Sequence, residues 1–152
     1  MLEQWDIPLD ELPLVVLDTE ATGLYPGLGH RLTEVAAVRY EKWRPVAKVS
    51  HMVYPERPIG AQASRVSGLT DDDVRDKPLF ADVAPELLEI LEGAVMVAHN
   101  APFDANLLSL ELFLSHYLHG RVSLLPTPPQ AGHPLPSNPW LCTLLLARQY
   151  FT

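Results

Sequence analysis

Apolar and polar positions follow each other along the chain in patterns that predict an α/β fold. Residues 13–17 form a short apolar run, which is typical of a β-strand buried on both faces. Residues 31–40 and 45–54 alternate with the period of two that a strand requires, and a connection short enough for a hairpin separates them. Three consecutive strands predict an antiparallel meander, and we expect the strand at 13–17 to lie inside the sheet.

Helical patterns follow in the next part of the chain. Thr70 stands before three aspartates at 71–73, and this order is typical of a helix N-cap with an acidic first turn rather than of a metal site. Apolar residues at helical spacing predict a further helix over 80–92, which the next glycine ends. Because Pro85 suits a first turn, we expect that helix to start nearer Asp82.

One more strand and two more helices complete the predicted fold. Residues 94–98 are apolar and follow a helix, so we expect a buried strand parallel to the first. A helix should start near Pro102 and continue to about residue 119. Residues 120–139 are rich in proline and are interpreted as a surface loop or a partly disordered insertion. Helical spacing predicts a last helix over 141–151.

Composition narrows the class of protein. The 152 residues fit one domain, spanning 1–152, that can bury a core, and their 47% hydrophobic and 20% charged content is ordinary for a globular protein. The single cysteine, Cys142, excludes an internal disulfide and suits a reducing compartment. Residues 1–12 are an acidic lead-in, unlike the basic start of a signal peptide, and no apolar run has the length of a membrane span. We therefore expect a soluble cytoplasmic protein.

The net charge restricts how the protein could hold a polyanion. With a formal charge of −8, it cannot rely on a broad basic surface to bind a phosphate backbone. If the substrate is a nucleic acid, metal ions must supply the local positive charge, or a partner must deliver the substrate.

Candidate chemistry gathers where the predicted strands end. Asp18 and Glu20 are two residues apart at the end of the first strand, so both side chains project from one face. Such like charges repel unless a cation joins them, and Mg²⁺ or Mn²⁺ prefers oxygen ligands. Asp104 follows the strand at 94–98, and neighbouring strand ends would bring it to the other two. The alternatives are a solvated strand end and a carboxylate that complements a helix dipole.

Four segments in this order resemble the DEDD family of 3′–5′ exonucleases, in particular the proofreading (epsilon) subunits of bacterial DNA polymerase III and their relatives. The segments are Leu-Asp-Thr-Glu-Ala-Thr-Gly-Leu at 17–24, Arg-Leu-Thr-Glu-Val-Ala-Ala-Val at 31–38, Val-Ser-Gly-Leu-Thr-Asp at 66–71 and Val-Ala-His-Asn-Ala-Pro-Phe-Asp at 97–104. The similarity resumes at 142–148. It implies a ribonuclease H-like α/β fold, with a mixed five-stranded sheet and helices on both faces.

The resemblance also implies a reaction and a set of site residues. It assigns Asp18, Glu20 and Asp104 as catalytic metal ligands for two divalent ions, Mg²⁺ or Mn²⁺. Such a site hydrolyses the phosphodiester at a nucleic-acid 3′ end and releases nucleoside 5′-monophosphates in DNA proofreading or repair. The implied partners are the 3′ end of a single-stranded nucleic acid, with DNA favoured, and a DNA polymerase subunit. The implied substrate-binding residues are Thr19, Thr22, Gly23, Leu24, His99 and Asn100.

The chain departs from this family in two respects. The Pro-rich segment at 120–139 has no counterpart in compact members, and the catalytic motifs differ. Members continue to a third catalytic motif, in which a His activates the water and an Asp five residues later completes the metal site. Neither is found before Thr152, and Glu111 is the last acidic residue. Any base or ligand within the chain would be sought first at Glu111 and His116, whereas His133 has no acidic neighbour in sequence.

This departure leaves two hypotheses open. The chain is an exonuclease, or it is a truncated, non-catalytic exonuclease-like binding module or gene fragment. In either case we expect weak Mn²⁺ binding, little nuclease activity by the chain alone, and self-association through an uncovered sheet face. A phosphotransferase that uses Asp18 as nucleophile is far less favoured, because it leaves the segment around Asp104 unexplained.

Overall fold

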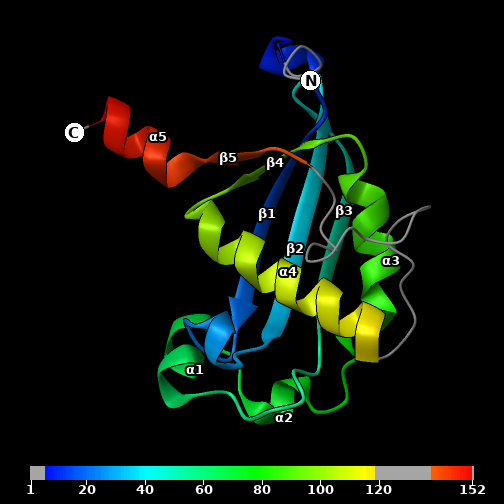
Figure 1. Cartoon of the computed structure of the whole chain (residues 1–152), viewed down its shortest axis with the longest axis vertical. Coiled ribbons are helices and arrows are strands. Elements are labelled where there is room, and N and C mark those ends of the chain that lie inside the picture. The colour runs from blue at the N-terminus through cyan, green and yellow to red at the C-terminus, as the bar shows by residue number, and fades with distance from the viewer. Residues whose placement is uncertain (1–5, 119–137, 152) are drawn as a thin grey trace.

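A five-stranded mixed sheet forms the centre of the protein in the computed structural model, which describes residues 6–118 and 138–151 (Figure 1). Its strands lie in the order β3-β2-β1-β4-β5. β1 pairs antiparallel with β2, and β2 pairs antiparallel with β3, whereas the β1–β4 and β4–β5 pairs are parallel. The strands are β1 (Leu14–Ala21), β2 (Leu32–Glu41), β3 (Arg44–Met52), β4 (Val95–Ala98) and β5 (Trp140–Cys142). The predicted meander with β1 inside the sheet, and the parallel fourth strand, are confirmed.

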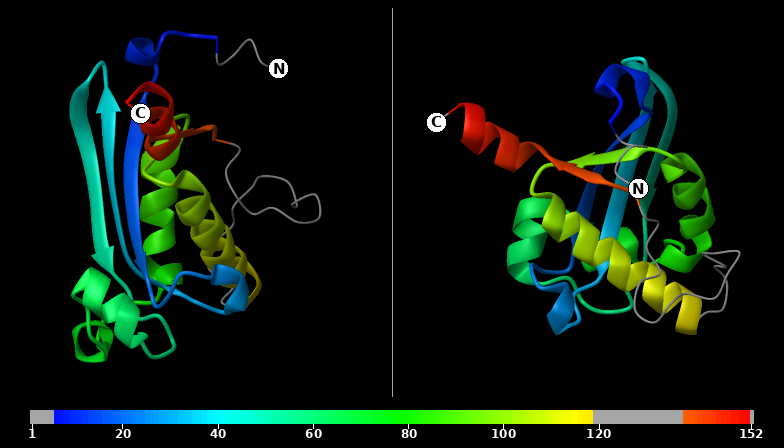
Figure 2. Two further views of the ribbon diagram at one scale, coloured as in Figure 1. Left: turned by 90° about the vertical axis from the view of Figure 1, so that its left-hand side faces the viewer. Right: turned by 45° about the horizontal axis from the view of Figure 1, so that its top comes forward.

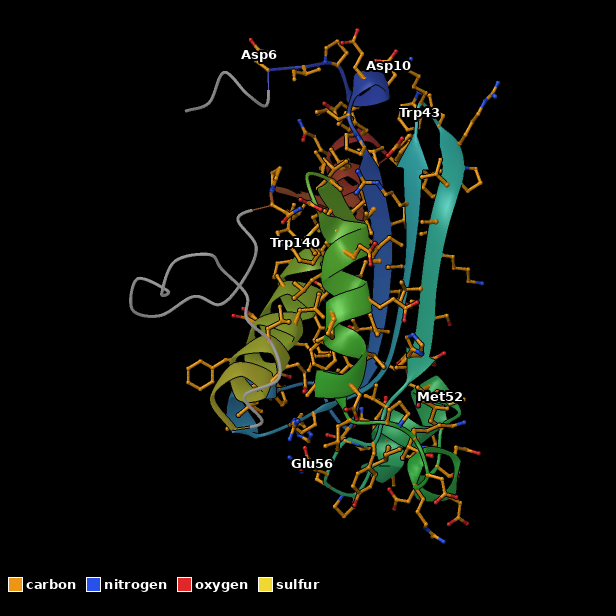
Figure 3. The ribbon with its side chains drawn as sticks, turned by 90° about the vertical axis from the view of Figure 1, so that its right-hand side faces the viewer. Asp6, Asp10, Trp43, Met52, Glu56 and Trp140 are labelled. Carbon is orange, nitrogen blue, oxygen red and sulfur yellow. The ribbon has the colours of Figure 1, made fainter. Side chains whose placement is uncertain are left out.

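The β2–β3 hairpin turns through two residues with left-handed backbone. Lys42 and Trp43 have φ values of 50° and 62°, and the flanking residues Glu41 and Arg44 pair with each other. Two consecutive positive φ values make a two-residue turn whose twist matches that of the strands. The predicted short connection is therefore a tight hairpin, at the end of the sheet far from Met52 (Figure 3).

Helices account for most of the remaining described residues. The two longest, α3 (Phe80–Leu91) and α4 (Ala101–Leu118), both pack on the same side of the sheet (Figure 2). None of the helices in residues 6–118 and 138–151 is long and apolar enough to cross a membrane. The others are α1 (Ala61–Ser67), α2 (Asp71–Val74), α5 (Thr143–Tyr150) and the 3₁₀ turns η2 (Leu9–Glu11) and η3 (Pro26–Leu28).

Two helix starts show how local hydrogen bonds decide a boundary. The backbone N–H of Thr70 donates to Asp73 Oδ2 at 2.8 Å, which confirms the predicted acidic helix start. In the same way, the N–H of Leu79 donates to Asp82 Oδ2 at 3.0 Å. Asp82 is therefore in the first turn of α3 and not at its start, and Pro85 lies inside the helix. The predicted start near Asp82 was wrong by two residues.

The C-terminal element differs from its prediction as well. Residues 140–142 form strand β5 rather than the beginning of a helix, because Met96, Val97 and Ala98 pair with them. Only Thr143–Tyr150 is helical. The Pro-rich loop predicted for 120–139 lies outside the described residues except for its last two, and the described part of the acidic lead-in contains the 3₁₀ turn η2.

The hydrophobic core lies between the sheet and the α3/α4 layer. Alternate residues of β1 and β2, among them Val15, Leu17 and Val35, are at most 2% exposed. They pack with apolar side chains of both helices, such as Leu87 and Leu108. The period of two along the strands thus directs one complete set of side chains into the core.

The opposite face of the sheet is more open. Val16 is 46% exposed, and Ala36 and Val38 on the neighbouring strand are half-buried. The prediction that the first strand is buried on both faces was therefore wrong at Val16. The mixed α/β fold is confirmed. We expected helices on both faces of the sheet, and in the described residues α3 and α4 form a layer on one face (Figure 2).

Candidate active site

β1 extends beyond the end of β4, and the candidate catalytic residues lie on this extension. The last β1–β4 pair is Val16 with Val97, whereas β1 continues to Ala21. Asp18 and Glu20 project from the open face of the sheet, where Asp18 is exposed and Glu20 is half-buried. The end of β4 thus leaves room beside both carboxylates.

Asp104 reaches this region from the first turn of α4. It is 3% exposed, and its Oδ1 accepts a hydrogen bond of 2.6 Å from the hydroxyl of Thr19. The pKa of Asp104 is raised to about 6, chiefly by burial and also by the negative charge of Asp18, while the hydrogen bond from Thr19 acts in the opposite direction. Thr19, predicted to bind substrate, therefore holds a carboxylate in place.

The electrostatics show that the three predicted ligands lie near one another. The pKa of Glu20 is raised first by burial and then by the negative charges of Asp18, Glu34 and Asp104. None of Asp18, Glu20 and Asp104 forms an ion pair with a basic side chain within residues 6–118 and 138–151. The site is a concentration of negative charge that a cation would stabilise.

The oxygen atoms of these carboxylates are the kind of ligand that a hard divalent ion prefers, and such an ion would relieve their mutual repulsion. Their arrangement is not yet a coordination shell. Among the described residues, no three His, Cys, Asp or Glu side chains are grouped closely enough to hold a metal ion together. Asp104 Oδ1 is instead hydrogen-bonded to the buried hydroxyl of Thr19. The carboxylates are near enough to raise one another's pKa, and their joint binding of a metal ion stays a prediction.

A pocket of about 450 Å³ opens beside Glu20. Three residues predicted to bind substrate line it, namely Thr22, Gly23 and Leu24. Other walls come from the loop after β1, from α1 and from α4, including Tyr25, His30, Gln62, Val66 and Phe103. Its size and mostly apolar lining are those of a small-ligand site.

Hydrogen bonds fix the loop that forms one wall of this pocket. Thr22 Oγ1 accepts a hydrogen bond of 3.0 Å from the N–H of Arg31 and lies 3.2 Å from His30 Nδ1. A Cβ at residue 23 would overlap the imidazole ring of His30, so any other residue there would force this ring to move. The glycine predicted as a turn residue thus also allows the close packing of His30.

His99 and Asn100 lie at the end of β4 and do not line the pocket. His99 Nδ1 is 3.1 Å from Thr143 Oγ1, and both His99 and Asn100 are exposed. Asn100 has a φ of 63°, which turns the chain from β4 into α4. Their predicted role in substrate binding stays a prediction.

Glu111 is bound by other residues of the protein. The sequence had made it a first candidate for the missing metal ligand. It is 1% exposed and accepts hydrogen bonds from Arg31 Nε at 2.8 Å and Nη2 at 3.0 Å. The backbone N–H of Leu32 donates to it as well. The side chain of His116 and all of His133 lie outside the described residues.

Sequence reasoning missed most of the pocket walls. The helix α1, which supplies Gln62 and Val66, was not predicted, and seven residues with no strong periodicity give little signal for it. Phe103 could have been found, because it lies in the same segment as Asp104.

Comparisons with known proteins identify the family of the chain. The family model described as Exonuclease (RNase_T) matches residues 15–152. A DNA polymerase III subunit epsilon-like protein of Rhodobacter capsulatus is 45% identical over 105 residues, which are 68% of this chain and 15% of that protein. The DNA polymerase III subunit epsilon of Rickettsia conorii is 36% identical over 107 residues, covering 70% of this chain and 46% of that protein. The chain thus spans less than half the length of either relative.

Solved structures show the same fold. Exonuclease X in complex with 5′ overhanging duplex DNA is 31% identical, with a TM-score of 0.61, and the match covers 91% of this chain and 64% of that one. Product-bound exonuclease I has a TM-score of 0.70 over 91% of this chain and 31% of that one, and its 18% identity supports the ribonuclease H-like fold alone. Taken with the family match over residues 15–152, these likenesses show that the chain belongs to the exonuclease (RNase_T) family.

Proposed function

We propose that this chain is the nuclease domain of a metal-dependent 3′–5′ exonuclease. It would hydrolyse the last phosphodiester at a nucleic-acid 3′ end, DNA in preference, and release nucleoside 5′-monophosphates in proofreading or repair. The observation that carries the proposal is the position of Glu20. It lines a nucleotide-sized pocket, and the negative charges of Asp18 and Asp104 contribute to raising its pKa.

Asp18, Glu20 and Asp104 would hold two divalent ions, Mg²⁺ or Mn²⁺. When bound, such ions supply an activated water and stabilise the negative charge on the leaving 3′-oxygen. Asp104 would give up its hydrogen bond from Thr19 and bind an ion instead, because a carboxylate binds a cation more strongly than it binds a neutral hydroxyl.

The pocket would receive the 3′-terminal nucleoside. Leu24, which is 62% exposed, and Phe103 offer apolar surface to a base without reading its identity. A pocket of this kind suits an enzyme that must remove any nucleotide. Its wall is fixed by the bonds of Thr22, so the terminal nucleoside would be oriented relative to Glu20.

The proposed partners follow from the relatives. Exonuclease X was solved with DNA, and the epsilon proteins are named as subunits of DNA polymerase III. We extend both to this chain: a single-stranded DNA 3′ end as substrate and a polymerase subunit as partner in the cytoplasm. A net charge of −8 supports delivery of the substrate by such a partner.

Substitution of Asp18 tests the proposal. A single-stranded oligonucleotide labelled in its 3′-terminal nucleotide is incubated with Mn²⁺ and the wild-type chain, the Asp18→Ala variant or the exposed control Asp10→Ala. We expect mononucleotide release, at whatever rate the wild type supports, to disappear in Asp18→Ala and to persist in Asp10→Ala. Mn²⁺-induced thermal stabilisation, followed in parallel, should also be lost only in Asp18→Ala. Unchanged release and unchanged stabilisation in Asp18→Ala would contradict the proposal.

A second candidate function is a non-catalytic module that binds a nucleic-acid end. The observation in its favour is that Glu111, a buried carboxylate on the helix that carries Asp104, is engaged by Arg31 and is not free to join a metal site. Such a module would retain oligonucleotide binding, which Leu24→Asp would weaken, while wild type and Asp18→Ala would both release no mononucleotide.

A further inference from the structure

The pocket beside Glu20 contains a histidine to which the proposed function assigns no role. The pocket is mostly apolar, and His30 lines it from the end of the loop after β1. Two other polar side chains of the lining, Tyr25 and Gln62, are exposed to water, whereas His30 is half-buried. A polar group that is held in place in a largely apolar pocket fixes the orientation of a bound ligand.

Thr22 decides which nitrogen of His30 carries the hydrogen. Thr22 is 1% exposed, and its Oγ1 accepts a hydrogen bond of 3.0 Å from the N–H of Arg31 and lies 3.2 Å from His30 Nδ1. A hydroxyl has one hydrogen to donate, and a buried hydroxyl needs an acceptor for it. In the part of the chain that the structure describes, Nδ1 is the one acceptor within reach, so Thr22 donates to it. The neutral imidazole therefore carries its hydrogen on Nε2.

Close packing fixes the imidazole ring at the pocket wall. The edge of the ring that bears both nitrogens lies over Gly23, where a Cβ would come within 2.6 Å of Nε2. Gly23 lines the same pocket, so Nε2 is next to its wall. Within residues 6–118 and 138–151, Nδ1 has a hydrogen-bond partner and Nε2 has none. The Nε2–H is thus a fixed donor that lacks an acceptor among these residues.

We propose that His30 is a substrate-binding residue whose Nε2–H donates a hydrogen bond to the base of the 3′-terminal nucleoside. This inference rests on the proposed function, which puts that nucleoside in the pocket. A neutral N–H suits a neutral acceptor, and His30 lines the pocket together with Leu24, which offers apolar surface to the base. Pyrimidine O2 and purine N3 are equivalent acceptors on the minor-groove edge of the bases. A donor to this edge would hold a base without reading its identity.

Thymidine binding to the full chain tests this hydrogen bond without metal or catalysis. Thymidine and its difluorotoluene analogue, which has the same shape but no carbonyl oxygens, are titrated into the isotope-labelled chain and followed by NMR. We expect the wild type to bind thymidine roughly tenfold more tightly than the analogue. His30→Phe keeps a ring without an N–H and should lose this preference, whereas His30→Gln keeps a donor and should retain part of it. The matched control is His51→Phe, because His51 contacts Glu86 outside the pocket.

The outcomes separate this inference from the proposed function. Equal affinity of the wild type for thymidine and the analogue would overturn the role of His30, and this measurement needs no variant to fold. A preference for thymidine that persists in His30→Phe would overturn it as well. Thymidine binding that is absent in the wild type, or unchanged in Leu24→Asp, would instead overturn the pocket as the nucleoside site of the proposed function.

NMR spectra of the ring nitrogens test the assigned position of the hydrogen directly. We expect the neutral ring of His30 to carry its hydrogen on Nε2 in the wild type and in Thr22→Ser, which keeps the hydroxyl. Thr22→Val removes that hydroxyl and should allow hydrogen on Nδ1. A hydrogen on Nδ1 of the neutral ring in the wild type would overturn the inference.

Discussion

Arg31 and Glu111 form a two-point ion pair between the start of β2 and the middle of α4. The distances are 2.8 Å for Nε to Oε1 and 3.0 Å for Nη2 to Oε2, and Glu111 is 1% exposed. Glu111 lies seven residues after Asp104, so two helical turns bring both onto one side of α4. The pair therefore ties the pocket loop, which ends at Arg31, to the helix that carries Asp104.

Loss of this pair should destabilise the fold. Glu111→Gln leaves the Leu32 N–H with a neutral partner and the Arg31 guanidinium with only its longer contact to Glu56, and we expect a loss of about 1–3 kcal/mol. Urea unfolding followed by circular dichroism measures this. The exposed pair of Arg39 with Glu41 is the control, and Glu41→Gln should cost less than about 1 kcal/mol. Equal, small losses in both variants would contradict the anchoring role.

Asp104 should make stability fall as the pH rises. Its folded-state pKa of about 6 lies above the ordinary value of 3.8, so the native state binds this proton more tightly than the unfolded state does. The resulting stabilisation is complete below pH 3.8 and is lost as the pH rises through 6. A shift of this size corresponds to about 2–3 kcal/mol.

The Asp104→Asn variant tests this linkage in metal-free buffer. Asn can still accept the Thr19 hydroxyl, but it carries no charge to desolvate. We expect it to exceed the wild type in unfolding free energy at pH 7.5 by about 2 kcal/mol and to equal it at pH 3.5. Asp72→Asn, an exposed residue that pairs with Arg75, is the control. A constant difference between Asp104→Asn and wild type across this pH range would refute the assignment.

The open sheet face should promote self-association. Val16 is 46% exposed on this face, and exposed apolar surface favours contact between molecules. We expect Val16→Lys to shift sedimentation velocity profiles of the 152-residue chain toward the monomer. Leu28→Lys, at an equally apolar and 76% exposed position in η3, should not. Identical profiles for wild type and both variants would remove the face as a contact.

Local pattern determined much of the sheet. β1, β2 and β3 were found from apolar runs and the period of two, because alternation reports directly which side chains enter the core. The start of α2 was found from Thr70 and its aspartates, because an N-cap bond spans only three residues. The proposed catalytic carboxylates Asp18, Glu20 and Asp104 were named from residue type and motif.

Tertiary contacts decided what lies far apart in sequence. Residues 141 and 142 were assigned to the last helix, yet pairing with β4 makes them part of a strand. Glu111 was a candidate ligand until Arg31, 80 residues away, was seen to bind it. Thr19 holds Asp104 across 85 residues, and Glu34 meets Glu20 only through strand register. Periodicity and caps act over one or two turns of chain, so the sequence shows them. A side chain's partner depends on which segments pack together, and only the folded chain fixes that.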